Sequence, residues 1–265
     1  MKPVILCAAV TGNKWTREDT PYIPQTIEEI ISHSLDAVEA GASILHIHAR
    51  DLNAGPNGKT HDPKFFKPLL DAFRKECPEV VLEMSVGFME GEVDKCLEPL
   101  LALKPDFASF NLKGSDEETE LMFKLFAKYQ VRPVFELFNL NMLQRVMEYR
   151  NKGYFSGPVC FNLVFDLEDC GQSMTAYAKQ MIDLVSGLPD DCEWFATRGG
   201  SCALDISSMA VALGGGIRTG LEDSIYMKEG VYAENSAQLI SRAKHLAEAM
   251  GKTIATPSET KSRIL

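Results

Sequence analysis

Short β-rich apolar runs alternate with longer stretches of helical period along nearly the whole chain, and this rhythm constrains the fold most strongly. The runs predict eight strands, at residues 4–10, 44–48, 80–85, 107–110, 131–136, 159–164, 193–196 and 217–219. Eight strand-then-helix units in 265 residues are typical of a TIM (β/α)8 barrel, so we expect an α/β fold with a single catalytic domain over residues 1–265. An open doubly wound sheet is the alternative, because periodicity does not show whether the sheet closes.

The first and last predicted helices carry clear start and stop signals. Thr26 and Glu29 form a capping box before a stripe of apolar residues, and Gly41 follows that stripe. The last helix is expected to begin near Asn235–Ser236 and to end at Gly251. Local chemistry therefore supports the strand–helix alternation that the periodicity indicates.

Charge and cysteine usage narrow the possible partners and compartments. The chain has 27 Lys and Arg against 37 Asp and Glu, a net charge of -10, and no run of basic residues. Nucleic acid and anionic membrane surfaces are therefore poor partners, and no apolar run approaches the roughly 18 residues of a membrane-spanning helix. The seven cysteines form no C-x-x-C pair, which favours reduced thiols in a cytoplasmic protein.

The segment ILHIHARD, residues 44–51, places two histidines at the end of the second predicted strand. The two-residue period of a strand directs His46 and His48 to the same side, into the mouth of a barrel. This H-x-H pattern is a common way to present two nitrogen ligands to zinc, although two structural, hydrogen-bonded histidines would give the same pattern. A catalytic zinc site needs a third protein ligand and keeps one position open.

The segment IRTGLED, residues 217–223, follows the last predicted strand and offers that third ligand. Strand eight borders strand one in a closed barrel, so the loop after it reaches the neighbourhood of strand two and makes Glu222 a candidate. Arg218 is a permanent cation within the strand and requires a partner, either Asp223 or an anionic substrate. A structural Arg–Asp pair that closes the barrel is the alternative interpretation.

Polar side chains also stand at the ends of three other predicted strands on the same side. Ser85, Ser109, Asn111 and Glu136 end three strands and would face the same mouth as the histidines. Gly199–Gly200 follow strand seven and precede a helix, where backbone amides favour an anion, although a tight turn is the commoner reason for two glycines. We expect substrate to bind among these side chains.

With these residues in view, the chain resembles the β-keto acid cleavage enzymes over essentially its whole length. The resemblance is carried by AAVTG, PYIP, HIHARD, LKPDFASFN, IRTGLED and GVYAENSAQL. It implies a zinc-dependent TIM barrel, usually a homotetramer, that exchanges acyl groups between a β-keto acid and acetyl-CoA. The implied products are acetoacetate and a new acyl-CoA.

The resemblance also implies roles for individual residues. His46, His48 and Glu222 match the zinc ligands of the family. Asp223, held by Arg218, is the candidate base that removes the proton next to the ketone. The other matched positions, which hold substrate or complete the site, are Ser85, Ser109, Arg218 and Glu136.

Two departures from the family pattern bear on the substrate. Members that accept 3-keto-5-aminohexanoate carry an acidic residue shortly after the first-strand Thr11-Gly12, where this chain has Asn13 and Lys14. We expect Thr11, Asn13 and Lys14 to lie near the substrate, and Lys14 to favour a neutral or anionic tail unless it points into solvent. The segment at 164–174 replaces a glycine-rich stretch, which leaves the contacts with CoA there open.

Two other functions are compatible with the same residues. One is a zinc-dependent TIM-barrel aldolase, lyase or hydrolase that does not use CoA. The other is a non-catalytic barrel that binds a metabolite and in which the histidines and the Arg–Asp pair are structural. Dependence on acetyl-CoA separates the first from the family reaction, and metal content separates the second.

Overall fold

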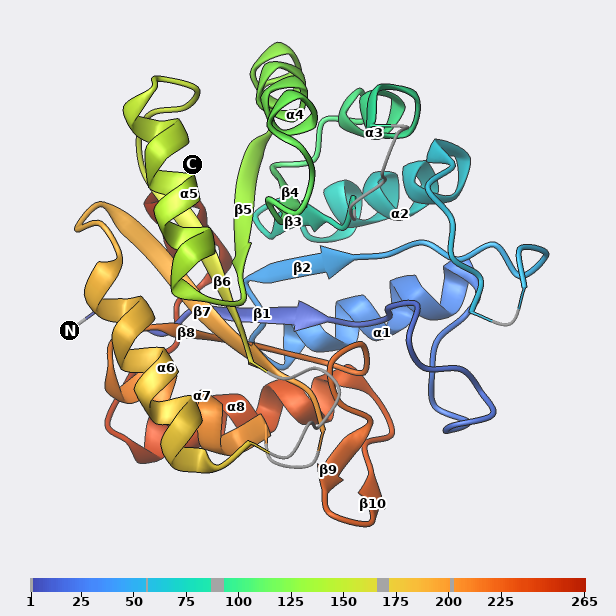
Figure 1. Cartoon of the computed structure of the whole chain (residues 1–265). Coiled ribbons are helices and arrows are strands. Elements are labelled where there is room, and N and C mark those ends of the chain that lie inside the picture. The colour runs from blue at the N-terminus through green and yellow to red at the C-terminus, as the bar shows by residue number, and fades with distance from the viewer. Residues whose placement is uncertain (1, 56, 87–92, 166–171, 201–202) are drawn as a thin grey trace.

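The computed structural model describes residues 2–55, 57–86, 93–165, 172–200 and 203–265. Within these residues, parallel strands close into a barrel in chain order, with β8 paired back to β1 (Figure 1). The closed barrel confirms the predicted TIM fold and excludes the open sheet. Its strands are β1 (Leu6–Ala9), β2 (Ile44–Ile47), β3 (Val81–Met84), β4 (Phe107–Phe110), β5 (Arg132–Leu137), β6 (Val159–Phe165), β7 (Cys192–Arg198) and β8 (Gly216–Thr219).

Helices surround the barrel and carry the expected end signals. The Thr26 side chain accepts from the Glu29 backbone N–H, and the Glu29 carboxylate accepts from the Thr26 N–H, so the capping box of α1 is present. Gly41 and Gly251 both adopt positive φ just beyond the helices they follow. The helices are α1 (Ile27–Glu39), α2 (Pro63–Glu76), α3 (Val93–Leu101), α4 (Asp116–Tyr129), α5 (Leu140–Asn151), α6 (Met174–Gly187), α7 (Ala203–Ala212), α8 (Ser236–Ala249) and α9 (Pro257–Ile264).

The C-terminal helix α9 blocks the end of the barrel at which the strands begin. Ile264 is buried in the apolar layer inside the barrel, and its carbonyl accepts from Arg132 Nη1 at 2.9 Å. Thr260 donates from its hydroxyl to Ser43 Oγ at 2.8 Å. The layer consists of Ile5, Cys7, Ile44, Val81, Phe107, Val134, Cys160, Phe195, Ala255 and Ile264. With this end filled by apolar side chains, a polar site belongs at the opposite end, where the strands finish.

A short hairpin that the sequence did not predict follows the β8 loop. Its strands, β9 (Tyr226–Lys228) and β10 (Val231–Tyr232), pair antiparallel and project beside the finishing ends of the barrel strands (Figure 1). Ile225 and Ala233, at the base of the hairpin, pack into a small buried cluster with Leu221. The hairpin is therefore anchored to the same loop that carries Glu222.

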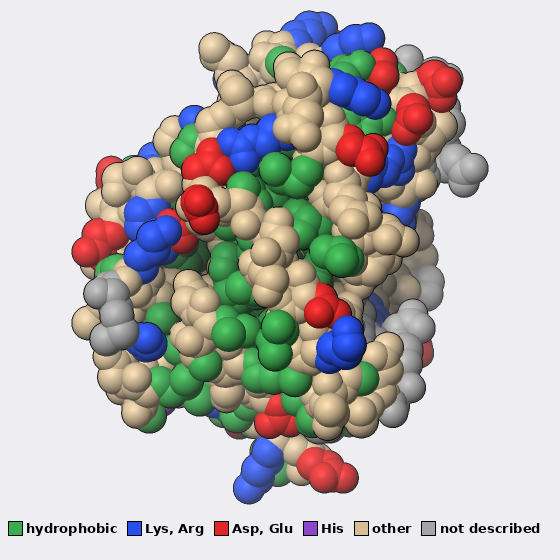
Figure 2. Space-filling view, turned by 60° about the vertical axis from the view of Figure 1, so that its left-hand side comes forward, with side chains coloured by type: hydrophobic (Ala, Val, Ile, Leu, Met, Phe, Trp, Pro, Cys, Tyr) green, Lys and Arg blue, Asp and Glu red, His purple; other side chains and the backbone are tan. Residues whose placement is uncertain are grey.

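Charged side chains of both signs share the surface. On the face shown in Figure 2, basic and acidic side chains are interspersed around a central band of hydrophobic ones, and no single basic patch forms there. In the part of the chain that the structure describes, no helix combines the length and apolar character needed to cross a bilayer.

Candidate functional site

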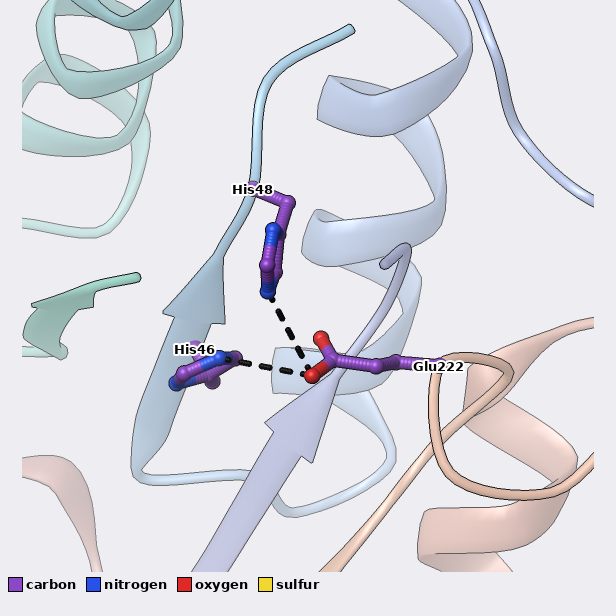
Figure 3. A group of neighbouring side chains, drawn as sticks. All are labelled: His46, His48 and Glu222. Carbon is purple, nitrogen blue, oxygen red and sulfur yellow. Dashed lines mark ion pairs between the residues drawn. The ribbon is translucent and has the colours of Figure 1, made fainter. Parts of the chain in front are cut away.

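Two imidazoles and one carboxylate converge at the end of the barrel where the strands finish (Figure 3). His46 lies in β2, His48 follows directly after it, and Glu222 extends from the loop after β8. The Nε2 atoms of His46 and His48 lie 3.5 and 3.4 Å from the same Glu222 Oε1. One ligand atom from each residue lies within 4.8 Å of the other two. The structure thus brings together the three side chains predicted from motifs 174 residues apart.

Closure of the barrel places Glu222 beside the histidines. Strand β8 pairs with β1, and this register sets Arg218 opposite Cys7. The Glu222 backbone N–H donates to the Ala9 carbonyl at 3.1 Å. Gly12 allows the carboxylate arm to pass, because a Cβ at that position would lie 2.5 Å from Glu222 Cγ. The loop after β8 is therefore held against the end of β1 and aimed at β2.

Each imidazole uses its other ring nitrogen to contact an oxygen acceptor. His46 Nδ1 lies 3.0 Å from Oε1 of the buried Glu83, and His48 Nδ1 lies 3.1 Å from Oδ1 of Asn13. Because a carboxylate and an amide oxygen only accept, both Nδ1 atoms carry the hydrogen in these contacts. In the neutral form of each ring, Nε2 is then free to offer a lone pair toward Glu222.

The spacing of these atoms suits a metal ion better than direct hydrogen bonds. Distances of 3.4 and 3.5 Å exceed the range of a good N–H···O bond. They match the edge, about 3.4 Å, of a tetrahedron of ligands with bonds near 2.1 Å. Glu222 Oε2 is buried and has no hydrogen-bond partner among the described residues. His46, His48 and Glu222 therefore fit a divalent metal.

Arg218 lies behind this cluster and binds two carboxylates. Its Nε and Nη2 lie 3.3 and 3.1 Å from the two oxygens of Asp223. The same Nη2 lies 2.6 Å from Glu222 Oε1. The structure thus places Arg218 and Asp223 together, as the sequence predicted, and ties both to the candidate ligand.

Burial and the neighbouring charges shift the pKa values of Glu222 and Asp223 in opposite directions. Burial favours the neutral form of Glu222, but His48 and Arg218 outweigh it and hold the pKa of Glu222 well below its usual range. Burial, together with the charge of Glu222, outweighs Arg218 at the neighbouring carboxyl and raises the pKa of Asp223 to about 6. Asp223 is therefore suited to accept and return a proton near neutral pH.

The other predicted strand-end residues line the same mouth. Ser85 and Ser109 are buried at the ends of β3 and β4, on the inward side by strand alternation. Asn111 Nδ2 lies 3.4 Å from Glu136 Oε2, and Glu136 Oε1 lies 3.9 Å from Arg218 Nη1. Asn111 Oδ1 and Arg218 Nη1 are buried without hydrogen-bond partners among the described residues. A ligand in the mouth would find an acceptor and a donor there.

Thr11 and Lys14, both expected near the substrate, have their described contacts within their own loop and its surroundings. The Thr11 hydroxyl is buried, donates to the Pro24 carbonyl at 3.0 Å and accepts from Arg50 Nε at 3.0 Å. Lys14 is exposed, with its ammonium 4.5 Å from the ring centre of Trp15. Thr11 thus organises its loop, and a role for Thr11 or Lys14 in substrate binding stays a prediction.

Gly199 and Gly200 follow β7 as predicted. Gly200 has a φ of 75°, and its carbonyl accepts from Ser224 Oγ at 2.7 Å, which joins this turn to the loop after β8. Residues 201–202 lie outside the described residues. So do 166–171, within the segment that departs from the family pattern. Binding of an anion or of CoA at either segment stays a prediction.

Three polar residues inside the barrel were missed in the sequence. Glu83 is fully buried beneath His46, and the signal for it is a lone charge within the apolar strand VLEM. Asn162 is also buried, and its Oδ1 accepts from the Thr197 hydroxyl at 2.7 Å. An asparagine in the apolar run of β6 was a weak signal, and Thr197 gave none.

Comparison with known proteins settles the family. The model of the beta-keto acid cleavage enzyme family matches residues 3–265. The chain belongs to this family. Its relatives include the 3-keto-5-aminohexanoate cleavage enzyme of Fusobacterium nucleatum, which is 31% identical over 98% of this chain and 97% of its own length.

A relative and a solved structure extend this result. The 3-oxoadipate:acetyl-CoA acetyltransferase of Cupriavidus necator is 26% identical to this chain. The match covers 98% of this chain and 94% of the relative's own length. The ternary complex of ObcA with a C4-CoA adduct and oxalate superposes with a TM-score of 0.78 at 19% identity. The superposition covers 91% of this chain and 67% of the ObcA chain, and it shows a likeness in fold.

Proposed function

We propose that this family member is a zinc-dependent enzyme that exchanges acyl groups between a β-keto acid and acetyl-CoA. The proposed products are acetoacetate and the acyl-CoA of the original substrate. One observation carries the proposal: two imidazoles whose Nε2 atoms face Glu222 Oε1 lie next to the Arg218–Asp223 pair. The relatives' names support the same reaction class.

In this proposal, His46, His48 and Glu222 hold the zinc. When bound, zinc supplies Lewis acidity to the oxygens of the β-keto acid. Glu83 and Asn13 keep the imidazoles oriented through their Nδ1 hydrogens.

Asp223 moves the proton. We infer that its carboxylate removes a proton from the carbon between the carboxylate and the ketone, because its raised pKa suits a base near neutral pH. Arg218, bound to both Asp223 oxygens, fixes the base and keeps its own positive charge close to the oxygens that become anionic. Ser85 and Ser109 are the further donors at the mouth.

The exchange balances without an added oxidant or reductant. The carbon that lost its proton forms a bond with the acetyl carbon, and the CoA sulfur passes to the former keto carbon of the substrate. The bond between the former keto carbon and the carbon that lost its proton then breaks, which releases an acyl-CoA. Asp223 returns its proton to the acetoacetate that remains.

The substrate tail is proposed to be neutral or anionic. Lys14 follows Asn13 in the loop after β1, near the mouth, and its positive charge would repel an ammonium. The relatives' names do not decide this, since 3-keto-5-aminohexanoate carries an amine and 3-oxoadipate a second carboxylate.

We also propose that residues 1–265 act as one catalytic domain of a cytoplasmic homotetramer. The support is membership of the family. Light scattering of the purified protein would give the number of chains in the assembly.

Metal content and a substrate panel test the function. Elemental analysis should find about one zinc per chain in wild type and a marked loss in His48→Ala and Glu222→Ala. The metal-loaded enzyme should then convert 3-oxoadipate or 3-oxohexanoate faster than 3-keto-5-aminohexanoate, with acyl-CoA formed only when acetyl-CoA is present.

Each alternative has its own result in this test. Turnover without CoA would indicate an aldolase, lyase or hydrolase. Absence of both bound metal and turnover would indicate a metabolite-binding barrel with structural histidines. A preference for the amino substrate would leave the reaction class intact and refute the proposed tail.

A further inference from the structure

The loop between β1 and α1 contacts two of the three candidate ligands. Gly12 packs against the arm of Glu222, and the next residue, Asn13, accepts from His48 Nδ1 at 3.1 Å. The Asn13 Nδ2 faces the Asn57 carbonyl at 3.5 Å. An amide that directs its nitrogen to a carbonyl must direct its oxygen to the imidazole. The Asn13 side chain therefore requires that His48 carry its hydrogen on Nδ1.

Arg50, the arginine of HIHARD, holds this loop on both sides of Asn13. Its Nε donates to Thr11 Oγ1 at 3.0 Å, and its Nη2 donates to the Trp15 carbonyl at 2.7 Å. The Arg50 side chain is buried, so these bonds are shielded from water. Arg50 comes two residues after His48, so one short segment supplies both the imidazole and the side chain that fixes its partner.

The two imidazoles are not held equally. A carboxylate, Glu83, accepts from His46, whereas a neutral amide accepts from His48. A carboxylate acceptor makes a ring nitrogen on the opposite side more basic than a neutral acceptor does. The strength of the His48 ligand is therefore set by the identity of residue 13.

We propose that Asn13 is a positioning residue that fixes the tautomer of His48, and that Arg50 acts through Asn13 by holding the loop that carries it. The inference rests on the proposed metal site for its effect on zinc. The tautomer itself is a property of the protein without metal. Asn13, which precedes Lys14 in the loop after β1, thereby connects this loop to the candidate metal ligands.

Zinc affinity measured by competition with a chelator tests the first part. Asn13→Ala should weaken zinc binding by about 10–100-fold. Asn13→Asp, which keeps the shape and offers a stronger acceptor, should bind zinc at least as tightly as wild type. Asn53→Ala is the matched control, because Asn53 is exposed and, among the described residues, its side chain hydrogen-bonds to Asp51 in the next loop. Equal affinities for wild type, Asn13→Ala and Asn53→Ala would overturn the proposal, as would weaker binding by Asn13→Asp than by Asn13→Ala.

The tautomer can be measured without metal. Nitrogen-15 NMR of the metal-free protein at about pH 8, where an ordinary imidazole is neutral, should show His48 with its hydrogen on Nδ1. In Asn13→Ala the hydrogen should shift toward Nε2, which faces Glu222 Oε1. The same tautomer in wild type and Asn13→Ala would refute the inference. Wild-type protein with this tautomer but no zinc binding would instead refute the proposed metal function.

A double-mutant cycle tests Arg50. Arg50→Lys keeps the charge but cannot reach both Thr11 and Trp15, so zinc affinity should fall in the same direction as in Asn13→Ala. Arg50→Lys combined with Asn13→Ala should lose little more than Asn13→Ala alone. Independent, multiplying losses would show that Arg50 does not act through Asn13.

Discussion

The unequal partners of the two histidines predict unequal costs of removing them from the metal-free protein. His46→Ala would leave Glu83 charged and fully buried, with Cys7 Sγ at 3.9 Å as its remaining side-chain contact among the described hydrogen bonds. Leaving a buried carboxylate without its hydrogen-bond donor costs about 3–5 kcal/mol, because its charge is then uncompensated. His48→Ala would free only the amide oxygen of Asn13 in a partly exposed position, a loss of about 1 kcal/mol.

The assay is urea unfolding of both variants after removal of metal with a chelator. The free energy of unfolding should fall by at least about 2 kcal/mol more in His46→Ala than in His48→Ala. Adding Glu83→Gln to His46→Ala should recover part of the loss, because no charge is then left buried. Equal losses in the two single variants, or no recovery in the double variant, would refute this account of Glu83.

Three further predictions follow from individual contacts. Gly12→Ala should weaken zinc binding at least about tenfold, because the new Cβ displaces the arm of Glu222; unchanged affinity in a chelator competition would contradict this. Ile264→Ala should lower the free energy of unfolding by about 2–5 kcal/mol while Leu265→Ala changes it little, and zinc affinity should be unaffected in both. Arg218→Lys should lower kcat by about 10²–10³-fold in a steady-state assay, since an ammonium cannot reproduce the paired bonds to the neighbouring carboxylates.

The barrel was predictable because strands buried on both sides read as short apolar runs between amphipathic helices. The hairpin was not, because strands of three and two residues are too short to show a period. Helix α9 was missed for another reason. Most of its residues are polar, and Ile264 gains its importance only from the barrel end that it fills.

The candidate ligands were predictable because barrel closure alone brings the loop after β8 to the end of β2. The partners of the histidines were not. Asn13 lies 35 residues before His48, and nothing in VTGNKW indicates that its amide faces an imidazole. Glu83 showed a signal, a charge in an apolar strand, but its partner depends on the register that sets it opposite His46.

The charges around Arg218 give a physical reason for a divalent ion rather than a proton at the centre of the site. The carboxylates of Glu83, Glu222 and Asp223 lie within electrostatic reach of the Arg218 guanidinium. All three raise the pKa of Arg218 and so stabilise its positive charge. With both imidazoles neutral, this buried region carries two more negative than positive charges if every carboxyl is ionised. The excess is costly in a region of low dielectric. Burial, together with the charge of Glu222, already outweighs Arg218 and raises the pKa of Asp223 to about 6. A divalent cation between the histidines and Glu222 would balance the excess and leave Asp223 ionised and available as a base.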